Sequence, residues 1–231
     1  HTLSGPTFLS LEEIDVDGVI TDVIDALAGI GYPYDYAFSH PDSRGYGVAV
    51  LWRTDQVSDV VWSGDYQGCS VWGSSDATND PLWDTCQATG EYPLFARPPV
   101  VVTGTVSYAG DDMQVVVIGN HLKSKLGGVA SDYQRLDQAT FLGELVDQFV
   151  AQSMENIVVL GDLNDFEDSA PLLALTASGN LENLFLDLPE EARYSYIYGG
   201  VSEVLDHVLV TPALHRWLQD FGPLHVNVDY A

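Results

Sequence analysis

Apolar and polar positions alternate along much of this chain in a way that predicts β-strands. In several segments apolar residues fall at every second position or form short continuous runs, which are the patterns of half-buried and fully buried strands. These segments are residues 7–11, 34–39, 46–53, 100–108, 113–122, 157–160, 194–198 and 204–210. Residues 56–62 follow the strand at 46–53 after a short turn, and we expect them to be its hairpin partner.

Three other segments have the spacing of helices. Residues 15–30 place apolar side chains at i, i+3 and i+4, and glycines end the pattern. Residues 131–152 form the longest such segment, and residues 171–177 form a short one. Helices interspersed with strands indicate a mixed α/β (α+β) fold. We expect residues 1–231 to form a single domain, because no linker or repeat interrupts the pattern.

The segment 156–165 carries the clearest chemical signal. A β-branched run predicts a strand buried on both faces, Gly161 ends it, and Asp162, Asn164 and Asp165 follow. Carboxylates at the rim of an apolar layer cost free energy unless something pairs with them, and a divalent cation is a natural partner. The alternative is a strand followed by an Asx-type turn. The metal hypothesis is favoured only if other strand ends supply matching groups.

Other predicted strands do end in such groups. Glu12 and Glu13 follow the first strand, His121 and Lys123 end the strand at 113–122, and Asp206 interrupts an apolar run. Taken singly, the glutamates could cap a helix, the histidine and Asp206 could be hydrogen-bonded structural residues, and the lysine could be solvated. Together at one rim they could bind Mg²⁺, Mn²⁺ or Ca²⁺ through oxygen and contact a phosphoryl group.

The charge balance narrows the class of partner. The chain has 231 residues and a formal charge of −26, from 34 acidic and 8 basic residues. This balance argues against nucleic-acid binding through a broad basic face, but not against an enzyme that screens charge with a metal. No apolar run approaches the length of a membrane span.

Two cysteines indicate the compartment. Cys69 and Cys86 flank a loop rich in Ser, Asp, Asn and Gly, with no histidine close to either. A disulfide between them is favoured over two free thiols and over a zinc site, and it points to an oxidising, extracellular location.

Several segments, in order, carry a family resemblance. They are Leu-Glu-Glu-Ile at 11–14, Gly-Val-Ala-Val-Leu-Trp-Arg at 47–53, Gly-Asn-His-Leu-Lys-Ser-Lys at 119–125, Gly-Asp-Leu-Asn at 161–164, residues 194–200 with 205–210, and His-Val-Asn-Val-Asp at 225–229. Together they resemble the endonuclease/exonuclease/phosphatase superfamily, in particular its secreted bacterial nuclease branch. The resemblance implies a four-layer α/β/β/α sandwich of the DNase I-like type.

The resemblance also implies roles for individual residues. Glu13 and Asp162 would bind the metal, and Asp162 would orient or deprotonate the attacking water. Asn164 would steady the phosphate, and His121 would bind a phosphate oxygen or assist the leaving group. Lys123 would contact a substrate phosphate.

Asp206 would orient a second histidine, and here the sequence departs from the family. The family's Ser-Asp-His-x-Pro box and its first strand, with an asparagine near the metal, are not found, so we expect the first and last family segments to be lacking. His207 and His225 are poor replacements, because Asp206 and His207 would point to opposite faces of a strand.

Three functions follow as expectations. The first is a secreted, divalent-metal-dependent phosphodiesterase, a nuclease that hydrolyses DNA or RNA. The second is a catalytically weakened extracellular module used for binding or assembly. The third keeps the chemistry but acts on small phosphoesters, as a phosphatase or phospholipase.

Overall fold

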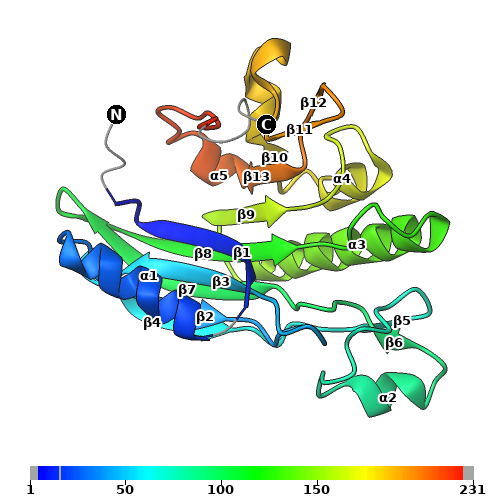
Figure 1. Cartoon of the computed structure of the whole chain (residues 1–231). Coiled ribbons are helices and arrows are strands. Elements are labelled where there is room, and N and C mark those ends of the chain that lie inside the picture. Colours follow the sequence, from blue (N-terminus) through cyan, green and yellow to red (C-terminus); the bar gives the residue numbers. More distant parts are fainter. Residues whose placement is uncertain (1–4, 16, 226–231) are drawn as a thin grey trace.

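The computed structural model describes residues 5–15 and 17–225 and contains two stacked β-sheets (Figure 1). The smaller sheet has the order β1-β3-β2, formed by Phe8–Ile14, Gly47–Arg53 and Tyr34–Phe38. The larger sheet has the order β10-β13-β9-β8-β7-β4. Its strands are Glu182–Asn183, Asp206–Val210, Ile157–Asp162, Asp111–His121, Val100–Tyr108 and Val57–Ser63. Its neighbouring strands are antiparallel except β8 and β9, which are parallel.

Helices cover the outer faces of both sheets. Helix α1 (Asp17–Gly29) packs on the smaller sheet, and α3 (Val129–Ala151) with α4 (Ala170–Leu175) packs on the larger one. This is the predicted four-layer α/β/β/α sandwich. None of the helices in the described ranges is long and apolar enough to cross a membrane.

Shorter elements lie at the periphery. They are α2 (Trp83–Gln87), α5 (Pro212–His215), the 3₁₀-helices η1 (Leu184–Asp187) and η2 (Glu190–Ala192), and two small strand pairs, β5 (Cys69–Ser70) with β6 (Tyr92–Pro93) and β11 (Tyr196–Tyr198) with β12 (Val201–Glu203).

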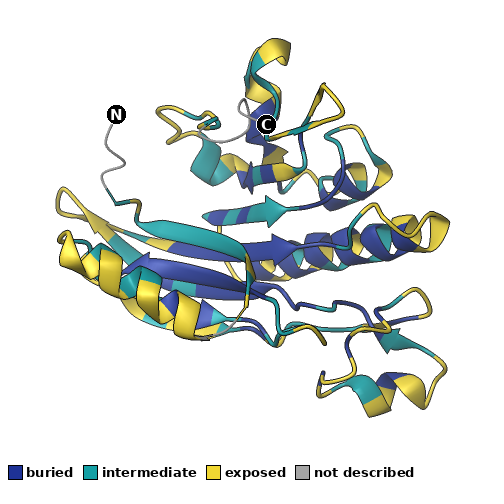
Figure 2. Cartoon of the chain, in the orientation of Figure 1, coloured by how far each residue is buried: buried dark blue, intermediate teal, exposed yellow. Residues whose placement is uncertain are grey.

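The apolar residues form three buried layers that match these contacts. One lies between the larger sheet and α3, a second lies between the two sheets, and a third lies under α1. Figure 2 shows the buried residues concentrated in the central strands. Every residue of β3 is buried because β3 has a strand on each side and an apolar layer on each face.

Two expectations about strands were wrong. The strand predicted as the hairpin partner of β3 is β4, which pairs with β7 in the larger sheet. Both edges of β3 are already occupied by β1 and β2, so the turn after β3 carries the chain into the other sheet. Strand β9 is not fully buried on both faces, because Val158 and Leu160 are half-buried on the side toward the smaller, narrower sheet.

The first strand is also longer than predicted. It continues to Ile14, so Glu12 and Glu13 lie within the strand, where a β-bulge shifts its register against β3. Of the segment 225–229 that contributed to the family resemblance, residues 226–229 lie outside the described residues.

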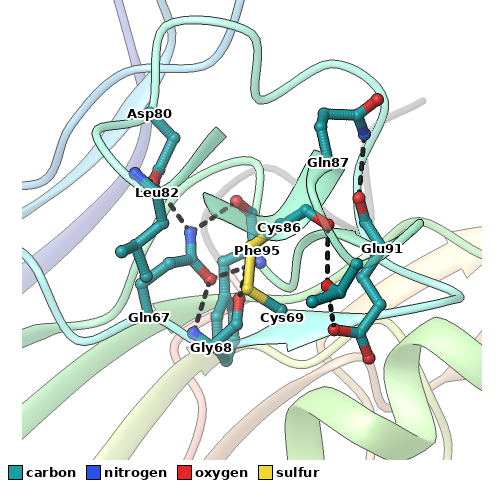
Figure 3. Close-up of a disulfide and its surroundings, with 10 residues drawn as sticks. Gln67, Gly68, Cys69, Asp80, Leu82, Cys86, Gln87, Glu91 and Phe95 are labelled. Carbon is teal, nitrogen blue, oxygen red and sulfur yellow. Dashed lines mark hydrogen bonds between the residues drawn. A yellow bond between two sulfur atoms is a disulfide. The ribbon is translucent and has the colours of Figure 1, made fainter. Parts of the chain in front are cut away.

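The predicted disulfide joins Cys69 to Cys86. Figure 3 shows that Gln67 cross-links the same region. Its side-chain Nε2 donates to Asp80 Oδ2 and to Phe95 O, both at 2.9 Å, and its Oε1 accepts from Phe95 N at 2.8 Å. The disulfide and these bonds tie the loop to the chain that leads into β7.

Removal of the disulfide should destabilise the protein. The double variant Cys69→Ser/Cys86→Ser should lose roughly 3 kcal/mol of unfolding free energy, because the unfolded chain regains the entropy of an open loop. Urea unfolding of the variant and of the oxidised wild type measures the difference. The double variant Ser58→Ala/Ser107→Ala, on β4 and β7, is a control for the substitutions. Equal midpoints for oxidised wild type and the cysteine variant would contradict the prediction.

Candidate active site

Three neighbouring strands place Asp206, Asp162 and His121 in one row. In the register of the larger sheet, Asp206 on β13 lies opposite Asp162 on β9, which lies opposite His121 on β8. Directly opposed residues point to the same face of a sheet. This is the face toward the smaller sheet, since Leu160, two residues before Asp162, packs in the layer between the sheets. His121 Nε2 lies 3.7 Å from Asp162 Oδ2.

Gly161 allows the backbone of β8 and the side chain of Glu12 to lie close to this row. Its φ is +127°, and a Cβ there would lie 2.0 Å from Asn120 O and 2.8 Å from Glu12 Oε1. Any other residue would clash with the backbone of β8 and would also displace the carboxylate of Glu12. The glycine of the Gly-Asp-Leu-Asn segment thus preserves the close pairing of β9 with β8 and leaves room for the Glu12 carboxylate.

The structure brings both glutamates of β1 to the site. Glu12 accepts a 2.8 Å hydrogen bond from Ser10 Oγ. Burial, with added repulsion from Asp206 and Asp162, raises the pKa of Glu12 to about 7. Glu13 is exposed, has a φ of 56° and acts electrostatically on Asp162. Of the two glutamates, the family resemblance gave the metal role to Glu13 alone, although Glu12 also stood at the end of the predicted strand. Strand alternation places Glu12 on the same face as Ser10, toward the larger sheet.

Asp162 is oriented by the turn that follows β9. The backbone N–H of Asn164 donates to Asp162 Oδ1 at 2.8 Å, and Asn164 itself has a left-handed φ of 54°. The Asn164 side chain donates from Nδ2 to Leu122 O at 3.2 Å, which ties the turn to the end of β8. Asn164 therefore fixes the position of Asp162 as well as lying near the site.

The crowded carboxylates predict a pH-dependent stability of the metal-free protein. Burial, followed by repulsion from Asp206, raises the pKa of Asp162 from 3.8 to about 7. Between these values the folded state binds a proton that the unfolded state does not, so stability falls as pH rises from about 4 to 7. Asp162→Asn lacks this titrating group. In EDTA its free energy of unfolding relative to wild type should therefore rise by on the order of 2 kcal/mol from pH 5 to pH 8. Urea unfolding at both pH values measures this, and a pH-independent difference would contradict it.

A cationic pocket adjoins the carboxylate row. It has a volume of about 320 Å³, and its lining includes three basic residues, His121 and two acidic residues: Arg44, Arg97, Lys123, His121, Asp42 and Asp76. Three of the eight lysines and arginines in a chain of net charge −26 therefore line one cavity. With Asp42 and Asp76 the charged side chains of the lining sum to +1, so the pocket still favours an anion in a strongly acidic protein.

Arg97 has unused hydrogen-bonding capacity in this pocket. It is 8% exposed, and within the described part of the chain its Nε and Nη1 have no hydrogen-bond partner. Asp42 Oδ2 lies 3.7 Å from Nη1 but binds Arg44 Nη2 more closely, at 2.7 Å. Buried donors without partners are costly and suit an anionic ligand. Sequence analysis missed Arg97; the available signal was a rare basic residue before Pro98 and Pro99.

His121 belongs to both the row and the pocket. Burial, with added repulsion from Arg97 and Arg44, lowers its pKa to about 3. The imidazole is therefore neutral at physiological pH and carries one N–H donor. No described residue forms a hydrogen bond with its buried Nδ1.

The sequence matches a known protein family. The sequence profile described as the Endonuclease/Exonuclease/phosphatase family matches residues 2–220. The chain belongs to this family. No curated protein matches the sequence.

Solved structures of family proteins share the fold of this family member. The human nocturnin catalytic domain with bound sulfate superposes with a TM-score of 0.55 and 17% identity, covering 90% of this chain and 70% of that one. The mannosyl-6-phosphatase of Bacteroides thetaiotaomicron gives 0.55 and 16%, covering 90% and 72%. D. rerio TDP2 with a single-strand DNA product gives 0.52 and 14%, covering 95% and 76%.

Two neighbouring polar groups of this family member have structural roles. His207 is buried on the opposite face from Asp206, as expected from strand alternation, and its Nε2 bonds Asp165 O at 2.8 Å while Asn183 Nδ2 bonds its Nδ1 at 3.0 Å. Asp165 forms ion pairs with Lys125 Nζ at 2.5 Å and Arg135 Nε at 2.9 Å. Neither residue is available to a ligand.

The carboxylates at this site suit a hard cation that is bound by few protein ligands. Within residues 5–15 and 17–225 no group of three or more His, Cys, Asp or Glu side chains is arranged to hold a metal ion. Asp162 with one glutamate of β1 offers two carboxylates. Mg²⁺ is commonly bound by one or two carboxylates with water and substrate phosphate, whereas zinc and dedicated calcium sites use more protein ligands.

Proposed function

We propose that this protein is a divalent-metal-dependent phosphodiesterase, a secreted nuclease that hydrolyses DNA or RNA. The observation that carries the proposal is the position of His121 between two parts of the site. This residue belongs both to the carboxylate row and to the cationic pocket. A phosphate in the pocket would therefore lie beside the carboxylates.

We assign Mg²⁺, with Mn²⁺ or Ca²⁺ as substitutes, to Asp162 and a glutamate of β1. Glu13 is the ligand that the family resemblance implies, and Glu12 is the additional candidate. Burial raises the pKa of Asp162 and of Glu12, and repulsion from neighbouring carboxylates adds to both shifts. A bound cation would relieve that repulsion. The cation supplies positive charge that polarises the phosphoryl group.

The residues of the pocket would bind and orient the substrate. Arg97 and Arg44 donate to phosphate oxygens, and Lys123 adds a third positive charge. The neutral imidazole of His121 donates its N–H to a phosphoryl oxygen.

The row would act on the water molecule. Asp162 would accept a hydrogen bond from the attacking water and take its proton on Oδ2, while Asn164 holds Oδ1 through its backbone N–H. As the water oxygen bonds to phosphorus, the P–O bond to the leaving group breaks, and the leaving oxygen takes a proton from solvent. The Asn164 side chain would steady the phosphate, as the resemblance implies, and Asp206 adds negative charge beside Asp162.

Two further observations support parts of the proposal. The disulfide supports secretion, because such bonds persist in oxidising compartments. The D. rerio TDP2 structure holds a single-strand DNA product in the same fold, which supports a nucleic-acid substrate.

A nuclease assay tests the proposal and separates the two glutamates. Plasmid DNA and single-stranded RNA should be cleaved with Mg²⁺ and not with EDTA. Glu13→Gln should lower the rate by about 100-fold or more if it binds the metal, because a neutral amide is a much weaker ligand. Glu12→Gln is measured beside it, and the exposed Glu155→Gln, before the far end of β9, is the matched control. Full activity in EDTA would reject metal dependence.

A phosphatase or phospholipase acting on small phosphoesters is the second candidate. The cationic pocket, at about 320 Å³, is close to the lower limit for small-ligand sites, roughly 300 Å³. The mannosyl-6-phosphatase among the similar structures fits the same idea. Release of phosphate from a sugar phosphate, without cleavage of either polymer, would favour this candidate. A third candidate, a catalytically weakened binding module, would release no product from any of these substrates.

A further inference from the structure

Two exposed aromatic rings lie stacked outside the cationic pocket. Trp72, in the loop closed by the disulfide, packs on Tyr133 of α3 with ring centroids 4.8 Å apart and an interplanar angle of 21°. Both remain open to solvent, with 41% and 46% of their surfaces exposed. Such a pair on the surface presents a large apolar area of fixed orientation.

The loop holds Trp72 in place through several contacts. Ser70 Oγ donates to Asp137 Oδ2 on α3 at 2.5 Å and accepts from Trp72 N at 3.0 Å. Gly73 passes so close to the neighbouring strand that a Cβ would lie 2.3 Å from Tyr92 O. The disulfide closes the same loop. The rings are therefore held by backbone and side-chain bonds rather than by their own stacking alone.

The same segments form a wall of the cationic pocket. Ser74 and Gln134, which line that pocket, lie two residues after Trp72 and one residue after Tyr133. Two residues span at most about 7 Å, so the rings are within reach of a group attached to an anion in the pocket. Gln134 Nε2 is itself fixed by a 3.0 Å hydrogen bond to Leu94 O.

Exposed apolar residues occur in the segments that carry the rings and the pocket wall. Leu126, which lines the pocket, is 84% exposed, and Val71 and Val129, close in sequence to Trp72 and Tyr133, are exposed as well. The acidic residues Asp132 and Asp137 on α3 are bonded to Arg135 and Ser70. In the pocket itself Asp42 pairs with Arg44, and Asp76 also lines the wall. The patch therefore combines a flat apolar surface with positive charge on one side, the combination that binds single-stranded nucleic acid.

We propose that Trp72 and Tyr133 form a stacking platform for a nucleobase whose neighbouring phosphate lies in the cationic pocket. The inference rests on the proposed nuclease function and adds a substrate preference. A paired base cannot leave its stack without cost, so the platform favours single-stranded over double-stranded substrate.

Binding is measured in an inactive background, so that it does not depend on cleavage. Asp162→Ala protein with Mg²⁺ is titrated with a fluorescein-labelled single-stranded oligonucleotide and with an abasic oligonucleotide of equal length. Adding Trp72→Ala should weaken binding of the base-containing strand by about tenfold, the scale of one stacked base. Binding of the abasic strand should stay unchanged. Trp72→Phe should retain most of the affinity, and Trp62→Ala, an exposed tryptophan on β4, is the control.

The outcomes separate the platform from the nuclease proposal. Equal loss for both strands, or no loss for either, would overturn the platform, because neither depends on a base. Thermal unfolding of each variant excludes loss of folding as the cause. Wild-type cleavage in Mg²⁺ is measured in parallel. If no nucleic acid is cleaved but Trp72→Ala still weakens binding only to the base-containing strand, the platform stands and the nuclease proposal fails.

Discussion

Asp162→Ala should lower kcat/KM for phosphodiester cleavage by about 10³-fold or more. Asp162 is the central member of the row, opposed to both Asp206 and His121. The substitution removes a metal ligand and the group that orients water in the same step, and losses of positioning and charge stabilisation each commonly exceed 10²-fold. No other described carboxylate occupies this place in the register.

The measurement is steady-state cleavage of a single-stranded oligonucleotide with saturating Mg²⁺. Asp111→Ala, at the start of β8 and exposed, is the matched control and should retain wild-type activity. Asp162→Asn tests charge separately from size and should be nearly as inactive. Unchanged cleavage by Asp162→Ala would reject the proposed mechanism, provided that its unfolding transition shows a folded protein.

Asp165→Ala should lower the free energy of unfolding by about 3–5 kcal/mol, at least as much as removal of the disulfide. Asp165 is buried and pairs with Arg135 Nε at 2.9 Å and with Lys125 Nζ at 2.5 Å. Removal of its carboxylate would leave the guanidinium of Arg135, which is 1% exposed, without its buried partner. Breaking one side of a buried ion pair costs this much because the remaining charge stays desolvated.

Urea unfolding of Asp165→Ala and of the exposed Asp168→Ala measures this effect. The double variant Asp165→Ala/Arg135→Met should recover part of the loss, since it removes the uncompensated charge. A loss below about 1 kcal/mol for Asp165→Ala, the usual size for a surface pair, would show that solvent reaches Arg135.

The sequence correctly predicted the features of the fold and site that a local pattern of side chains determines. The run at Ile157–Val159 and the following glycine predicted β9 and its polar end, and the register confirms that Asp162 and His121 are neighbours. Strand alternation correctly separated Asp206 from His207. These features depend on the period of side chains along one strand, which neighbouring residues determine.

Other parts of the site depended on contacts that no local pattern contains. The pairing of β4 with β7 followed from competition for the edges of β3, which is a property of the whole sheet. Glu13 joined Glu12 near the site because a β-bulge, with a left-handed φ of 56° at Glu13, interrupts the alternation of β1. Arg97 lies outside any strand, and its importance follows from its burial with unpaired donors.

The parallel pairing of β8 and β9 has a consequence for divergence within the family. His121 and Asp162 leave their strands at the same end because α3 returns the chain between them. Much of the chemistry is therefore encoded in one continuous β-α-β stretch, whereas Trp72 and Arg97 come from the preceding loops. Mutation can remodel those loops, and with them the wall of the pocket, while the pairing that places His121 beside Asp162 is kept.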